Sequence, residues 1–156
     1  MSLTIRPMRG ADVPAASKLV TDCYRFLAER QGFSAAQLKG LLDQRCSAAY
    51  VGKCLREFEH HVAEVDGEMV GLVGIEGHEL AELWVSPKRH RQGIGAALFR
   101  KAEDVISAAG HPVLTVHTTG YGTPFYRAMG CRIVGQKPCD RGPLKGWPHT
   151  NMEKRR

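Results

Sequence analysis

The chain has 156 residues, close to the commonest size of a single domain, and 43% of them are apolar and 24% charged. This composition is that of an ordinary globular protein, and it excludes both a disordered chain and a small fold that depends on disulfides. The formal net charge of +6 suggests an anionic partner, either a nucleic acid or a phosphorylated small molecule; the alternative is that most of these charges only solvate the surface. We therefore expect one domain over residues 1–156.

The apolar residues are too scattered to form a membrane segment, and residues 1–10 lack the apolar stretch of a secretory signal. We expect a cytoplasmic protein without a membrane partner. The five cysteines are odd in number and contain no C-x-x-C pair, so neither a disulfide framework nor a zinc ribbon is expected. No other pattern predicts a metal site.

The first third of the chain predicts one strand and two helices. Residues 3–7 alternate between apolar and polar and end at a proline, which is typical of a strand. Residues 13–30 carry apolar side chains at helical spacing, and a second helix is predicted over residues 34–45 with Ser34 as its N-cap.

A three-stranded meander follows. Residues 58–65 and 68–75 are rich in strand-forming residues and are joined by Asp66-Gly67, a dipeptide that favours a tight hairpin turn. Residues 79–85 predict the third strand. His60 and His61 would point to opposite faces of their strand, and we expect a surface role for them rather than a place in the site.

The remainder alternates between helices and strands. Helices are predicted over residues 95–109 and 123–129, each followed by a glycine, and strands over residues 112–118, 131–137 and 147–153. The order β-α-α-β-β-β-α-β-α-β-β predicts an α/β (α+β) fold in which helices flank a mixed sheet.

The most informative stretch is residues 83–98 (LWVSPKRHRQGIGAAL). A strand ends at a proline, a basic loop follows, and two glycines precede a helix. The unpaired N–H groups at such a helix start, with the positive end of its dipole, form an anion site. Leu98 stands where a dinucleotide fingerprint has its third glycine, and the Gly-Lys-Ser/Thr of a P-loop is absent.

Residues 90–95 (HRQGIG) resemble the Gln/Arg-x-x-Gly-x-Gly/Ala motif of the GCN5-related N-acetyltransferases, with His90 in place of the usual Gln or Arg. A second stretch, residues 121–131 (YGTPFYRAMGC), is similar to the later Phe-Tyr and Gly-Phe signature of the same family, with Cys131 in place of Phe. One helix and one strand separate the two motifs, as in that family.

The resemblance implies the fold of that family, a mostly antiparallel mixed sheet of about six or seven strands with about four helices. It also implies acetyl-coenzyme A as co-substrate, with the pyrophosphate held by backbone amides of the glycine loop and the pantetheine arm held by a strand that splays from its neighbour. The residues that this implies for cofactor binding are Leu83, Trp84, Val85, His90, Arg91, Gln92, Gly93, Ile94, Gly95, Ala96 and Phe125.

Tyr126 occupies the position of the tyrosine that, in the family, donates a proton or a hydrogen bond to the coenzyme A sulfur. A phenol suits a departing thiolate because it donates without carrying a permanent charge. The alternative interpretation is an aromatic side chain that packs the last helix.

The general base is open between three alternatives. With strict alternation, Glu79, Ala81, Leu83 and Val85 share one strand face, and several family members place their base at the position of Glu79. Glu82 faces the other way unless a bulge shifts the parity. A chain of water molecules could also carry the proton.

The predicted function is transfer of an acetyl group to a primary amine by direct attack; the alternative is a non-catalytic acyl-coenzyme A sensor or partner subunit. The acceptor, a small molecule or a peptide, has no motif of its own. Nucleic acid is not expected, because the phosphate site already explains the basic loop. Homodimers are common in the family, and the oligomeric state stays open. Segments that border the acceptor pocket in this fold carry Tyr24, Phe26, Trp147 and His149.

Overall fold

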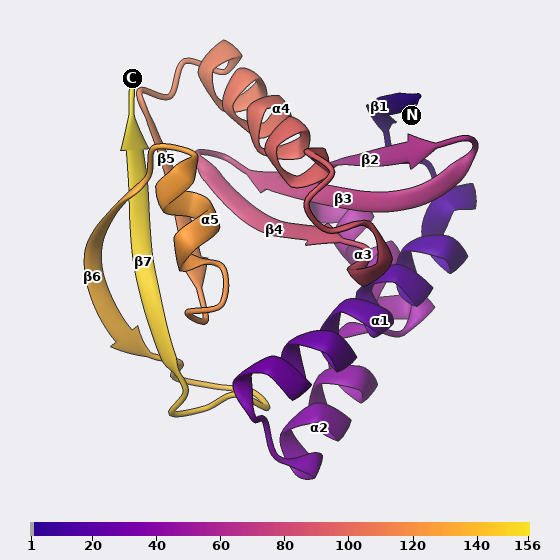
Figure 1. Cartoon of the computed structure of the whole chain (residues 1–156), viewed down its shortest axis with the longest axis vertical. Helices are drawn as coiled ribbons and strands as arrows, with labels where there is room; N and C mark the ends of the chain where they lie inside the picture. Colours follow the sequence, from indigo (N-terminus) through magenta and orange to yellow (C-terminus); the bar gives the residue numbers. More distant parts are fainter. Residues whose placement is uncertain (1) are drawn as a thin grey trace.

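The computed structural model describes residues 2–156 (Figure 1). Its sheet strands, in chain order, are β1 (Leu3–Pro7), β2 (Glu59–Val65), β3 (Glu68–Glu76), β4 (Glu79–Val85), β5 (Val113–Thr118), β6 (Arg132–Pro138) and β7 (Pro148–Arg155). The α-helices are α1 (Val13–Gln31), α2 (Ala35–Arg45), α3 (Ala48–Glu57), α4 (Ile94–Ala108) and α5 (Thr123–Ala128), and short 3₁₀ turns are η1 (Gly10–Asp12) and η2 (Pro87–Arg89).

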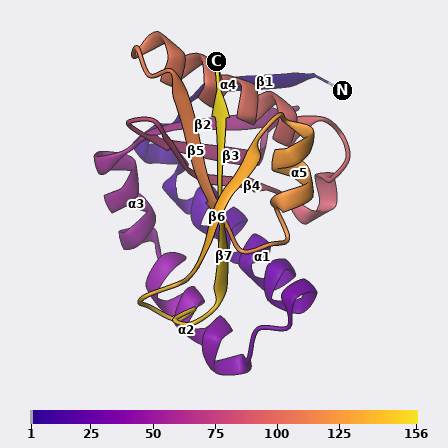
Figure 2. The ribbon, with the colours of Figure 1, turned by 90° about the vertical axis from the view of Figure 1, so that its left-hand side faces the viewer.

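The seven strands form one sheet in the order β1-β2-β3-β4-β5-β7-β6. Every neighbouring pair is antiparallel except β4 and β5, which are parallel, so the expected mixed, mostly antiparallel sheet is confirmed. Figure 2 shows β5, β6 and β7 crossing the direction of β1 to β4 at a steep angle. The sheet is therefore divided into two halves that meet where β4 touches β5.

Local signals in the sequence set several of these boundaries. In the β2–β3 turn, Asp66 and Gly67 have φ angles of 52° and 80°, the left-handed pair that a tight hairpin requires. The Ser34 hydroxyl accepts a hydrogen bond from the Gln37 amide at 3.0 Å, and the Gln37 side chain accepts one from the Ser34 amide. This reciprocal capping starts α2 where the sequence predicts it.

Helix α3 was not predicted, and the expectation of two helices before the hairpin is wrong. Ser47 begins α3 as an N-cap by accepting a hydrogen bond from the Tyr50 amide at 3.1 Å. Val51 and Cys54, three residues apart, form its buried side. The N-cap Ser47 and the clear apolar stripe of this ten-residue helix were signals that the sequence offered.

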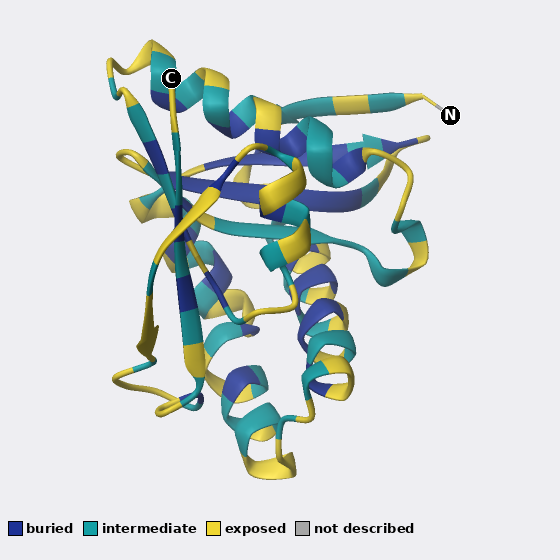
Figure 3. Cartoon of the chain, turned by 60° about the vertical axis from the view of Figure 1, so that its left-hand side comes forward, coloured by how far each residue is buried: buried dark blue, intermediate teal, exposed yellow. Residues whose placement is uncertain are grey.

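Two apolar cores lie on opposite faces of the sheet (Figure 3). Helices α4 and α5 cover one face, where Leu98 and Phe99 are fully buried. Helices α1, α2 and α3 cover the other, where Leu41 and Val62 are fully buried. We call these the α4 face and the α1 face. In residues 2–156 no helix is both long and apolar enough to cross a membrane.

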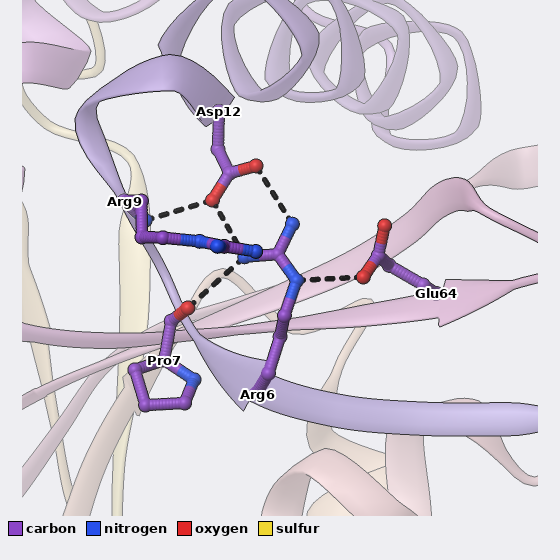
Figure 4. Close-up of polar contacts among 5 residues, drawn as sticks. All are labelled: Arg6, Pro7, Arg9, Asp12 and Glu64. Carbon is purple, nitrogen blue, oxygen red and sulfur yellow. Dashed lines mark hydrogen bonds and ion pairs between the residues drawn. The ribbon is translucent and has the colours of Figure 1, made fainter.

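An ion cluster fixes the start of α1 against the sheet edge (Figure 4). The Arg6 guanidinium of β1 donates two hydrogen bonds to Asp12 at 2.8 Å and one to Glu64 of β2 at 2.6 Å. Asp12 also accepts the Arg9 amide at 2.7 Å. The hydrogen bonds from Arg6 hold the pKa of Asp12 at about 2, because they favour the ionised carboxylate.

Candidate active site

Strands β4 and β5 separate soon after they meet, as Figure 1 shows. Their only registered pair is Glu79 with Thr115, supported by a hydrogen bond from the Thr115 amide to the His78 carbonyl at 3.0 Å. Beyond Glu79, the edge of β4 that faces β5 has no strand partner. Its backbone N–H and C=O groups are therefore open to a ligand, apart from the Val85 carbonyl, which side chains of this chain contact.

A bulge in β4 changes which side chains share a face. The pairing with β3 runs from Ile75 with Leu80 to Gly74 with Glu82, so Ala81 is the extra residue. Leu80, Leu83 and Val85 face the α4 core, whereas Glu82 and Trp84 lie on the α1 face. The strict alternation that grouped Glu79 with Leu83 and Val85 is therefore wrong, because one residue is inserted between them.

The glycine loop joins the end of β4 to the start of α4. Arg91 and Gly93 have φ angles of 63° and 79°, so the chain turns sharply before Ile94, and Gly93 is the N-cap of α4. A Cβ at Gly93 would meet no atom within 4 Å, whereas one at Gly95 would lie 3.2 Å from the Phe125 ring. Open space therefore lies at Gly93, beside the free N–H groups of the first turn of α4.

A cleft of about 630 Å³ lies between β4, the loop, α4 and α5. It contains all but one of the residues predicted to bind the cofactor; the exception is Gln92, which is exposed and does not line it. Tyr126 also lines the cleft, although its side chain is only 7% exposed. Burial raises the pKa of Tyr126, so its hydroxyl keeps its proton at neutral pH.

His90, the departure from the family pattern, has an evident structural contact. Its Nε2 lies 3.2 Å from the Val85 carbonyl oxygen, and its ring packs edge-on against Phe26 at 5.0 Å between centroids. The Cys23 thiol donates to the same carbonyl at 3.3 Å. His90 thus ties the basic loop to the end of β4 and to helix α1.

A second cavity, of about 140 Å³, lies on the α1 face of β4. We call it the helix-side cavity. Trp84 lines both this cavity and the cleft, so the two spaces adjoin at β4. The Trp84 indole nitrogen is buried and has no hydrogen-bond partner among residues 2–156. A buried donor of this kind is satisfied most simply by a ligand or a water molecule.

Glu82 and His60 form a pair at the helix-side cavity. The Glu82 Oε1 lies 3.3 Å from the His60 Nε2, and the His60 Nδ1 lies 3.1 Å from the Phe58 carbonyl oxygen. Burial lowers the pKa of His60, but the hydrogen bond and charge of Glu82, with the Phe58 carbonyl, outweigh it and leave the pKa raised.

The expected surface role of the two histidines is wrong, since His60 is 6% exposed and His61 is 5% exposed. A bulge in β2 follows them, at Ala63 and Glu64, and helix α3 covers the part of the face that His60 occupies. The sequence rule placed them correctly on opposite faces but did not show that both faces of this strand are covered.

Glu79 belongs to a different and more open pair. Its Oε1 lies 3.0 Å from the His117 Nε2, and the His117 side chain is about half exposed. Glu79 stands where β4 and β5 are still joined, and it lines neither the cleft nor the helix-side cavity. The two acidic side chains are similarly exposed, 32% for Glu79 and 27% for Glu82, but they differ in the burial of their histidine partners and in the space they face.

The four residues predicted to border an acceptor pocket are distributed over the molecule. Tyr24 lines the helix-side cavity and packs on Trp84 at 4.7 Å between ring centroids. Phe26 lines the cleft instead. Trp147 packs edge-on against Phe33, and neither Trp147 nor His149 lines either cavity.

The fold is a mixed sheet in which two parallel neighbouring strands diverge and leave a cleft beside the N-terminus of a helix. The family model for the acetyltransferase (GNAT) domain matches residues 29–156. The chain therefore belongs to the GNAT acetyltransferase family. Peptidyl-lysine N-acetyltransferase YiaC of Escherichia coli (strain K12) is 35% identical over 97 residues, which are 60% of this chain and 63% of that protein. The match thus spans less than two thirds of the curated relative.

Solved structures agree on the fold. A GCN5-related N-acetyltransferase from Rhodopseudomonas palustris superposes with a TM-score of 0.91 at 18% identity, over 100% of this chain and 97% of the other. PaiA N-acetyltransferase from Thermoplasma acidophilum, solved in complex with coenzyme A, gives a TM-score of 0.79 at 18% identity over 100% of both chains. At this level of identity, the comparison establishes the fold alone.

Proposed function

We propose that this protein transfers the acetyl group of acetyl-coenzyme A to a primary amine by direct attack. One observation carries the proposal: the free edge of β4, the N-terminus of α4 and the buried side chain of Tyr126 all line the same cleft. Membership of an acetyltransferase family and the coenzyme A complex of a structural relative support it.

The residues present fit coenzyme A. Gly93 leaves the first turn of α4 uncovered, so its N–H groups can hold the pyrophosphate. A side chain at Gly95 would press against Phe125 and narrow the cleft. Leu83, Trp84 and Val85 offer the open edge of β4 to an amide-containing arm, and Arg89 and Arg91 line the cleft as cations. The chemistry and the polarity of the cleft thus match a phosphorylated, amide-bearing ligand.

Acetyl-coenzyme A supplies the activated acetyl group: the amine nitrogen forms a C–N bond to its carbonyl carbon as the C–S bond breaks. Backbone N–H groups on the open edge of β4 stabilise the negative charge that develops on the carbonyl oxygen. The Tyr126 hydroxyl gives its proton to the departing sulfur and is reprotonated from solvent. The amine must lose a proton to become nucleophilic, and a second leaves the nitrogen as the amide forms.

We assign the receipt of these protons to Glu82 rather than Glu79. Glu82 lies in the cavity that adjoins the cleft at Trp84, whereas Glu79 lines neither space. The Phe58 carbonyl can only accept, so the His60 Nδ1 carries a proton and the Nε2 is left to share one with Glu82. His60 is thus a positioning residue that stabilises the ionised carboxylate and can take a proton from it.

The test is calorimetric titration with acetyl-coenzyme A, comparing the wild type with Gly93→Glu. The matched control is Gly110→Glu, at the other end of the α4 region, where φ is also positive and no atom lies within 4 Å. We expect micromolar binding by the wild type and the control, and a loss of about ten-fold or more in Gly93→Glu. Absence of binding by the wild type refutes the proposal.

The same titration separates the enzyme from a non-catalytic acyl-coenzyme A sensor. A sensor would bind acetyl-coenzyme A with the same affinity, yet release no coenzyme A with any amine. Substituting Tyr126 and Glu82 together would then leave every measured property unchanged. An enzyme instead loses turnover in that double variant while its affinity for the co-substrate is kept.

A further inference from the structure

The helix-side cavity has a polar character that the proposed proton transfer does not explain. Glu82, the proposed proton acceptor, lines it, but so does Arg45 from the last turn of α2. Tyr24 of α1 and Tyr50 of α3 line the same space. The lining thus includes one carboxylate, that of Glu82, and one guanidinium, that of Arg45.

Arg45 has no acidic partner. It is half-buried, and no ion pair within residues 2–156 involves it, although the chain forms eleven other such pairs. The one carboxylate that lines the cavity, Glu82, is paired with His60 instead. A guanidinium that loses water without gaining a counter-ion is costly to the fold, so its presence needs a reason.

The groups around Arg45 are neutral, and its guanidinium is close enough to the Tyr24 hydroxyl to donate a hydrogen bond to that oxygen. Burial raises the pKa of Tyr24 to about 12 and that of Tyr50 to about 12, so both phenols keep their protons at neutral pH. Burial likewise raises the pKa of the Cys54 thiol on α3. The unpartnered Trp84 indole is a further donor. A guanidinium with neutral donors beside it is the arrangement that binds a carboxylate, often through two parallel hydrogen bonds.

We propose that the helix-side cavity binds the acceptor, and that the acceptor is a small amine that also carries a carboxylate. Its nitrogen lies toward Glu82 and the cleft, and its carboxylate pairs with Arg45. The inference rests on the proposed acetyl transfer and specifies the substrate class. Small size follows from a cavity of about 140 Å³ closed by α1, α2 and α3. The product is the N-acetylated acid, with free coenzyme A.

The experiment uses matched pairs of probes: the standard L-amino acids, each compared with its own primary amide, which keeps the amine but removes the anion. Release of coenzyme A is followed with a thiol reagent at saturating acetyl-coenzyme A. We expect at least one free acid to be acetylated with a kcat/KM about ten- to a hundred-fold above that of its amide.

Substitution at Arg45 then tests the cause. Arg45→Gln should raise the KM for the acid about ten- to a hundred-fold and leave the amide unaffected, while Arg45→Lys restores part of the preference. Arg141→Gln is the control, because Arg141 is an exposed arginine on the neighbouring loop, and its loss changes the net charge equally. Circular dichroism and acetyl-coenzyme A affinity check that each variant is folded.

Several results would overturn the assignment. Equal turnover of acids and amides, an unchanged acid preference in Arg45→Gln, or acetylation only of polyamines or lysine-containing peptides would each do so. If acetyl-coenzyme A binds but no acid is acetylated, the substrate class is wrong and acetyl transfer to another amine stands. If acetyl-coenzyme A does not bind at all, the proposed function itself fails.

Discussion

Gly74 separates the two members of the Glu82–His60 pair, so substituting it perturbs the pair without deleting either residue. Gly74 lies on β3 between β2 and β4, and a Cβ added there would be 2.8 Å from the His60 Nε2 and 2.9 Å from the Glu82 Cγ. Ordinary contact begins at 3.4 Å, so the imidazole must retreat by about 0.6 Å (3.4 − 2.8). The pair is already 3.3 Å apart, and such a shift breaks its hydrogen bond.

We expect Gly74→Ala to cost about 1–3 kcal/mol of unfolding free energy through overpacking. We also expect a fall of about ten- to a hundred-fold in kcat/KM with any amine acceptor, because the base is displaced. Acetyl-coenzyme A affinity should be unchanged, since Gly74 does not line the cleft. The control is Gly135→Ala on β6, where a Cβ meets no atom within 4 Å.

The direct assay is titration of the His60 ring by NMR, which needs no acceptor. In the wild type the pKa of His60 should lie above its ordinary value, because Glu82 favours the imidazolium. In Gly74→Ala and in Glu82→Gln it should fall below that value, because burial remains while the contact with the carboxylate is lost. An unchanged His60 pKa in both variants would refute the reasoning that Glu82 and His60 act as a pair.

Three further outcomes are expected. The stability that the raised pKa of His60 contributes is fully present below the unfolded value of 6.5 and is lost as pH rises through the folded pKa. The difference in Tm between wild type and Glu82→Gln should therefore be largest below pH 6.5 and shrink as the pH is raised above it. Asp12→Asn should lower the unfolding free energy by about 1–2 kcal/mol at neutral pH. The effect should be present above the unfolded pKa of 3.8 and be lost as the pH falls through the folded pKa of about 2. Denaturant unfolding at several pH values measures it. Tyr126→Phe should reduce kcat by about ten-fold or more while the affinity for acetyl-coenzyme A is kept. Stopped-flow measurement of coenzyme A release checks this, and an unchanged rate of release would contradict the role of Tyr126 as proton donor.

The local signals in the sequence determined most of the secondary structure. The Asp66-Gly67 turn, the Ser34 cap and the glycines after α4 and α5 act within a few residues, and the structure has them where the patterns predict. The anion site at the glycine loop could also be predicted, because a strand, a turn and the start of a helix bring backbone N–H groups together through local contacts alone. Helix α3 is short but clearly amphipathic and packs against α1, so the pattern that would have predicted it was present in the sequence and was missed.

What only the tertiary structure decided is which side chains meet. The bulge at Ala81 arises from pairing with β3 and reverses the face of every residue before it, so no alternation rule could choose between Glu79 and Glu82. His60 becomes a partner of Glu82 because β2 and β4 both flank Gly74, a relation between residues more than twenty positions apart. Arg45 resembles any basic residue at the end of a helix until α1, α2 and α3 close around it. Caps and turns depend on neighbouring residues and can be predicted from the sequence. Burial and side-chain pairing depend on contacts that form only when the whole sheet has assembled.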